Sequence, residues 1–133
     1  MSTSISTEYG SLFANGACFL GLVPFALGIN ALLRPESALA LLQFAAPPQP
    51  EAQKLTKSFI YMQGARNLAY GFTTLAIWYT GHREPLGYAA FAGMFIVLVD
   101  GFVARYQLGR GEWNHWAFAP VSVAVGAGLL GWI

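Results

Sequence analysis

The sequence predicts an all-α integral membrane protein, an antiparallel bundle of four transmembrane helices that forms a single domain over residues 1–133. Of the 133 residues, 56% are hydrophobic and only 10% are charged, whereas a soluble domain carries about 25% charged residues. The mean hydropathy is +0.49. The apolar residues fall into four runs, each close to the roughly 20 residues that a helix needs to cross a bilayer. These runs use nearly the whole chain and leave no separate soluble domain.

The first span is expected at residues 10–33. It is interrupted by Asn15, Pro24 and Asn30, and a kink is expected at the proline. No Lys or Arg precedes this run, so it lacks the basic region of a cleavable signal peptide. We therefore interpret it as a span that the protein keeps.

The connection over residues 34–57 is the longest and the least regular. Residues 36–44 have the pattern of a short amphipathic helix on the membrane surface, and a proline-rich stretch follows them. The second span is expected at residues 58–79 and is unusually polar for a helix in lipid. It ends at a turn formed by residues 80–82.

The third span is expected at residues 86–103 and the fourth at residues 113–133, with a short polar link between them. Basic residues indicate the orientation of the bundle. Only Arg83 lies at one end, whereas the other end carries Arg34, Lys54, Lys57, Arg105 and Arg110. The positive-inside rule then places both termini outside the cytoplasm. We expect a multi-pass protein of the endoplasmic reticulum membrane.

Composition also excludes several classes of function. The single cysteine, Cys18, excludes an internal disulfide and a Cys-rich metal site. Seven basic and six acidic residues give a net charge of +1, which provides no field suited to a nucleic-acid partner. His115 and Asp100 alone supply too few ligands for a metal site, and no cofactor is expected.

A polar stripe runs along the second span, where Gln63, Arg66, Asn67, Tyr70 and Thr74 follow at spacings of three and four. Arg66 lies ~12 Å inside its helix, deep enough that exposure to lipid would cost several kcal/mol. The only acidic residue within any span is Asp100, which lies ~8 Å from the same end of the third helix. We therefore predict that Arg66 and Asp100 meet.

The other two spans bring polar groups to the same depth. Asn30 ends the first span and His115 begins the fourth, and this convergence depends only on the antiparallel succession of helices. Glu8 precedes the first span at the opposite end, so it is excluded from the site unless the N-terminus folds inward. A polar cavity between the helices is predicted, because a single ion pair would not require so many polar neighbours.

A structural interpretation competes with a functional one at nearly equal weight. A buried arginine and carboxylate can neutralise each other and fix helix register without any chemistry. His115, near the membrane interface, also fits a hydrated surface histidine.

The stretch GARNLAYG at residues 64–71, followed by Leu86-Gly87 and by VDGF at residues 99–102, resembles a family of small four-helix fungal membrane proteins. That family is classed as a domain of unknown function and is similar to DoxX-like proteins. The resemblance covers about residues 34–133. Some such proteins lie in fungal polyketide and meroterpenoid pathways of secondary metabolism, where they look like epoxide hydrolases or cyclases that act on apolar intermediates. By position, the resemblance implies functional roles for Arg66, Asn67 and Asp100, with a looser match at His115.

The leading hypothesis is a membrane-embedded enzyme that opens an epoxide by hydrolysis or cyclisation, or isomerises a lipophilic metabolite, by acid–base catalysis. Asp100 is predicted to act as acid or base, Arg66 to orient and tune it, and His115 to handle the second proton. The predicted substrate-binding residues are Gln63, Asn67, Tyr70 and Asn30. The expected partners are a lipophilic small molecule and membrane lipid, and a homo-oligomer is left open. The rival hypotheses are a noncatalytic lipid-binding or structural subunit and a proton-coupled transporter, which would have to oligomerise.

Overall fold

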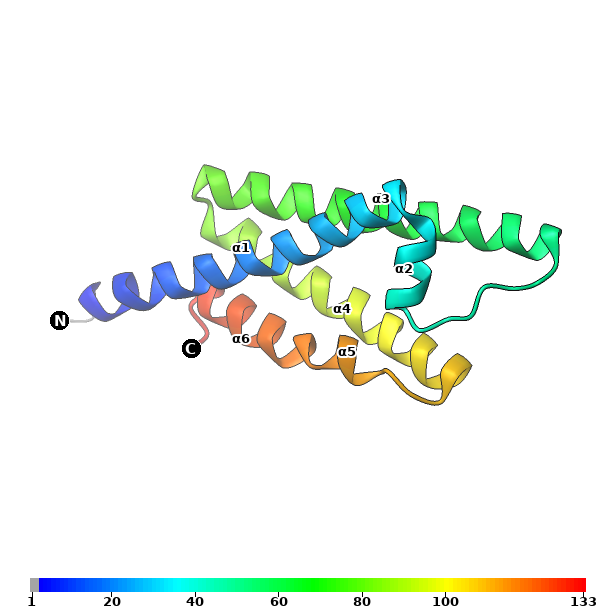
Figure 1. Cartoon of the computed structure of the whole chain (residues 1–133). Coiled ribbons are helices and arrows are strands. Elements are labelled where there is room, and N and C mark those ends of the chain that lie inside the picture. The colour runs from blue at the N-terminus through cyan, green and yellow to red at the C-terminus, as the bar shows by residue number, and fades with distance from the viewer. Residues whose placement is uncertain (1–2) are drawn as a thin grey trace.

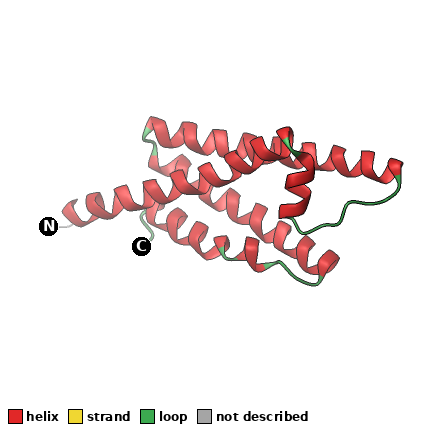
Figure 2. Cartoon of the chain, viewed as in Figure 1, coloured by secondary structure: helices red, strands yellow, loops and turns green. Residues whose placement is uncertain are grey.

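The computed structural model describes residues 3–133, and within this range the chain is all-helical and contains no strand (Figure 2). The helices are α1 (Thr3–Leu33), α2 (Pro35–Leu41), α3 (Pro50–Thr80), α4 (Arg83–Leu108), α5 (Trp113–Trp116) and α6 (Phe118–Leu130). Helices α1, α3 and α4, and then α5 together with α6, form four rods that run antiparallel in succession (Figure 1). The side chain of Glu8 lies outside the described residues, so its predicted exclusion from the site stays a prediction.

Helix α1 continues through Pro24. Because proline has no backbone N–H, the carbonyl of Leu20 loses its usual helical donor at this point. The helix ends at Leu33, and Pro35 occupies the first turn of α2, where a missing N–H costs nothing.

Helix α2 covers Pro35–Leu41 rather than the expected 36–44, because the chain turns at Gln43, which has a φ of 64°. Ala38 packs between α1 and α3, and the Nζ atom of Lys57 lies 2.7 Å from Oε1 of Glu36. Through this hydrogen bond the Lys57 ammonium lowers the pKa of Glu36 below its ordinary value of 4.5. On acidification the contact is therefore lost as the pH falls through that lowered pKa.

Helix α3 begins at Pro50, eight residues before the expected start of the second span. Its first turns are polar and include Lys54 and Lys57, so the helix extends past the apolar run that marked the span. Proline at its first position is preorganised for a helix start. At the other end Gly81 adopts a φ of 75°, a conformation that glycine reaches without strain.

Helix α4 is longer at both ends than the expected span of residues 86–103. The fourth rod is not one continuous helix over residues 113–133, because it is interrupted at Ala117 and α6 ends at Leu130. Pro120 accounts for the interruption, since it supplies no N–H to the carbonyl of Trp116 and its ring crowds that carbonyl.

Two pairs of rods make the most extensive contacts, α1 with α3 and α4 with α6. Glycines determine how closely α1 and α3 approach each other. The two helices meet where Gly28 lies against Gly64 and where Gly21 lies against Gly71. A Cβ atom added to Gly71 would lie 2.6 Å from the carbonyl oxygen of Gly21, so only glycine permits this separation between the helices.

The outer surface carries many large apolar side chains. Phe72 of α3 and Phe95 of α4 are each 64% exposed. Two of the described helical segments, Tyr9–Leu33 and Arg83–Leu108, are long and apolar enough to cross a membrane.

Candidate functional site

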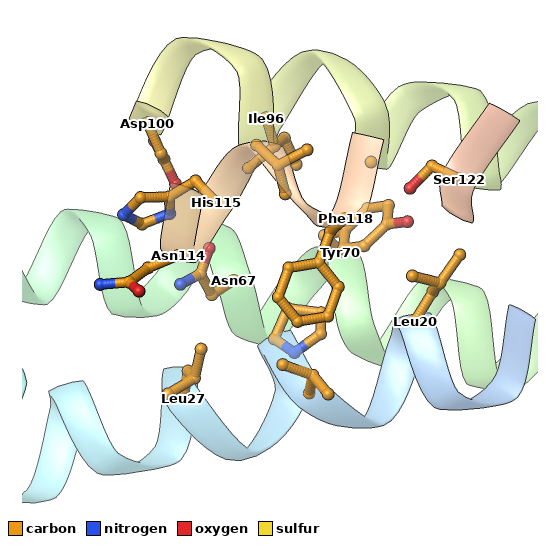
Figure 3. A pocket seen from close by; sticks show the side chains of 14 residues that line it. Leu20, Leu27, Asn67, Tyr70, Ile96, Asp100, Asn114, His115, Phe118 and Ser122 are labelled. Atoms are coloured by element: carbon orange, nitrogen blue, oxygen red, sulfur yellow. The ribbon is translucent and has the colours of Figure 1, made fainter. Parts of the chain in front are cut away.

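A cavity of about 110 Å³ lies at the centre of the bundle, where all four rods contribute to its wall. One part of the wall is apolar, with Leu20, Leu27, Ile96 and Phe118 among its residues (Figure 3). The polar lining residues are Asn67, Tyr70, Asp100, Asn114, His115 and Ser122. The space is sufficient for several water molecules or for one functional group of a larger ligand.

Arg66 and Asp100 meet as predicted. Nη2 of Arg66 donates to Oδ2 of Asp100 at 2.8 Å and also lies 3.4 Å from Oδ1 of Asn67. The Asp100 side chain is 18% exposed and lines the cavity, whereas the Arg66 side chain is 39% exposed and does not line it. Arg66 therefore holds the carboxylate from outside, and Asp100 is the member of the pair that can reach a ligand.

His115 joins Asp100 in the lining of this cavity, although the two residues come from α5 and α4 (Figure 3). Among the described residues, neither Oδ1 of Asp100 nor the imidazole of His115 has a hydrogen-bond partner. Both groups can exchange a proton with a molecule bound between them.

A tryptophan positions the short helix that carries His115. Nε1 of Trp116 donates to the carbonyl oxygen of Leu98 at 3.2 Å, and the indole packs directly over Gly101. Its ring also meets Phe102 edge-on, with ring centroids 5.1 Å apart. These contacts hold α5 on α4 and keep His115 beside the cavity.

Tyr70 crosses from α3 to α4 and donates its hydroxyl proton to the carbonyl oxygen of Ala89 at 3.0 Å. The ring fits because Gly93 has no side chain at the point of contact. The hydroxyl proton is therefore occupied, and the oxygen of Tyr70 keeps its role as an acceptor for a ligand or water.

Two of the predicted binding residues lie elsewhere. Asn30 and Gln63 line a second cavity of about 320 Å³ under α2, not the cavity that holds Asp100. The side chains of Asn67 and Asn114 border both cavities.

Sequence reasoning missed several lining residues. Asn114 and Ser122 belong to the fourth rod, where Asn114, Phe118 and Ser122 follow at spacings of four and all line the cavity. This spacing, which places the three residues on one helix face, was the signal that could have found them. Pro24 also lines the cavity, although its role was predicted only as a kink. Among the described residues no three His, Cys, Asp or Glu side chains come together, so the structure assigns no set of metal ligands.

Comparison with known proteins assigns the chain to a family. No curated protein and no solved structure matches it. The model of one family, described as Domain of unknown function (DUF4267), matches residues 21–129. The matched range starts in α1 and ends in α6, so it contains every residue that lines the central cavity except Leu20. The chain therefore belongs to the DUF4267 family of domains of unknown function.

Proposed function

We propose that the four rods cross a membrane, with the endoplasmic reticulum as the site of insertion. The exposed apolar side chains of α3 and α4 support this proposal, because soluble monomers rarely expose large apolar patches. In a bilayer the same side chains contact lipid, and the helices satisfy their backbone polar groups internally. The basic residues at the start of α3 and the end of α4 then face the cytoplasm.

Cysteine labelling tests this topology. In a Cys18→Ala background, Lys54→Cys marks the start of α3 and Glu84→Cys the start of α4. In sealed vesicles with the cytoplasmic face outward, a membrane-impermeant maleimide is expected to label the first variant at once. It should label the second only after detergent is added. The background variant without cysteine is the control, and labelling of both positions in intact vesicles would contradict the four-span arrangement.

Within this membrane we propose acid–base chemistry on a lipophilic small molecule, either opening of an epoxide or isomerisation. The observation that carries the proposal is the presence of Asp100 and His115 in one cavity whose remaining wall is largely apolar. An apolar wall favours an apolar ligand, and two titratable groups can serve as acid and base in the same reaction.

In hydrolysis, the group in its acid form donates a proton to the epoxide oxygen as the carbon–oxygen bond breaks. The other group takes a proton from water while the water oxygen bonds to the carbon, and the product is a diol. In cyclisation, a hydroxyl of the same molecule attacks the carbon in place of water and gives its proton to the base. Where a double bond attacks instead, the base takes a proton from a carbon next to the resulting cation. The Arg66 contact at 2.8 Å fixes one carboxylate oxygen, which directs the other toward the reacting atoms.

Turnover by the purified protein tests this proposal. The wild type in detergent is incubated with a series of polyene epoxides in H₂¹⁸O, and the products are identified by mass spectrometry. We expect diols that carry one ¹⁸O atom, or cyclised or rearranged isomers without it. Reactions without protein give the background, and a wild type that adds nothing to this background would contradict an enzymatic role.

One observation favours a second candidate, a noncatalytic lipid-binding subunit. Arg66 contacts Asp100 directly at 2.8 Å and can neutralise its charge, as a purely structural ion pair would. This candidate requires that Arg66→Gln lowers the thermal stability of the protein while the wild type shows no turnover.

A further inference from the structure

A second cavity lies beside the central one, between α1, α3, α5 and the short helix α2 that covers it. Its volume of about 320 Å³ exceeds the 110 Å³ of the central cavity. The two share Leu27, Asn67 and Asn114 in their walls. The two cavities are therefore neighbours, and these three side chains lie where a molecule longer than the central cavity would pass into the second one.

The polar lining of this second cavity has a single chemical character. Its polar side chains are the carboxamides of Asn30, Gln63, Asn67 and Asn114, and no lining residue is charged. Carboxamides donate and accept hydrogen bonds without carrying charge. An ionic group would find no counter-charge here, whereas a neutral polar group would find several partners.

The side-chain amide of Asn30 contains a donor that is unpaired in the part of the chain that the structure describes. Its Nδ2 atom is buried and has no acceptor among the described residues, whereas buried donors in proteins are normally paired. Asn30 lines the cavity from α1, and rotation about its Cβ–Cγ bond redirects the amide nitrogen. An acceptor oxygen in the cavity would complete this group.

We propose that the second cavity binds a neutral acceptor oxygen, such as an ester or ketone carbonyl, of the lipophilic molecule that occupies the central cavity. Asn30 donates to this oxygen, with Gln63 beside it. The inference rests on the proposed function in taking the reacting end of the same molecule to lie at Asp100. Binding at Asn30 itself does not require turnover.

Ligand-dependent stability tests the proposal. The protein in dodecyl maltoside, which has no ester, is unfolded thermally at rising concentrations of methyl decanoate, decane or sodium decanoate. The concentration dependence of the midpoint gives each Kd. We expect the methyl ester to bind more tightly than the alkane or the carboxylate. We further expect Asn30→Leu to weaken ester binding by about fivefold to tenfold, as for the loss of one hydrogen bond.

The controls keep this result interpretable. Gln63→Leu removes a second carboxamide from the same cavity and replaces Asn30→Leu if that variant fails to fold. Gln107→Leu removes an exposed carboxamide of α4 and should leave ester binding unchanged. Equal binding of decane and the ester, or unchanged ester binding in the folded variants at Asn30 and Gln63, would overturn the proposal.

Two further arms identify the source of the oxygen and separate the two proposals. Stabilisation by dimyristoylphosphatidylcholine that is lost in Asn30→Leu assigns the oxygen to a membrane lipid, and stabilisation by methyl decanoate alone assigns it to a free small molecule. An effect of Asn30 on binding, together with no turnover by the wild type, would remove the enzymatic proposal and leave this one standing.

Discussion

Asp100→Asn is expected to reduce turnover by a factor of about 10² to 10⁴, the usual contribution of a positioned acid or base. The substitution keeps the size of the side chain and its capacity to accept from Nη2 of Arg66, so the fold should persist. It removes the carboxylate that lines the cavity with His115, and an amide cannot exchange a proton at neutral pH. Initial rates with the epoxide that the wild type converts fastest measure the effect.

Glu84→Gln is the matched control for this variant. It neutralises an exposed carboxylate at the opposite end of α4, so it should retain the wild-type rate. Arg66→Gln should lower turnover less than Asp100→Asn does, because Arg66 positions the carboxylate without lining the cavity. If Asp100→Asn elutes as a folded protein in size-exclusion chromatography and keeps full turnover, Asp100 has no part in the chemistry.

Gly71→Ala is expected to destabilise the protein by about 1–3 kcal/mol, the range for overpacking a close contact. The added methyl group would lie 2.6 Å from two backbone atoms, the carbonyl oxygen of Gly21 and the amide nitrogen of Phe25. Backbone atoms inside helices cannot move aside as a side chain can. We therefore expect the loss of stability to lie near the upper end of this range. The midpoint of thermal unfolding in detergent measures it.

A larger residue on the exposed side of the same helix provides the comparison. Ala69→Leu adds more carbon atoms than Gly71→Ala, yet Ala69 is exposed, so its midpoint should stay close to that of the wild type. Equal midpoints for Gly71→Ala and the wild type would show that α1 and α3 do not depend on this close approach.

The contact between Arg66 and Asp100 was predictable because it needs only the approximate depth of each residue within its apolar run, although both helices extend beyond those runs. Depth follows from counting residues at a fixed rise, and an antiparallel succession brings equal depths together. The all-helical character followed in the same way from the length and spacing of the apolar runs. The expected membership of a family of domains of unknown function is confirmed by the match over residues 21–129, whereas the fungal, DoxX-like and epoxide hydrolase parts of that resemblance stay predictions.

The division of the site into two cavities was not predictable by this reasoning. Depth places Asn30 and Gln63 near Asp100, but it does not give the direction in which each helix faces its neighbours. That direction depends on the glycine contacts between α1 and α3, and on α2, which covers one cavity and not the other. The direction of the fourth rod similarly decides that Asn114 and His115 both reach the central cavity. The catalytic and binding roles of all these residues stay predictions.

The two glycine contacts between α1 and α3 also determine how the molecule can deform. Gly21 and Gly28 are seven residues apart, as are Gly64 and Gly71, so the two contact points lie about 10.5 Å apart along the helices. A single close contact would act as a pivot, but two on one line resist both sliding and rotation of one helix against the other. We therefore expect α1 and α3 to move as one body, so that a change in the width of the central cavity comes from displacement of α4, α5 and α6.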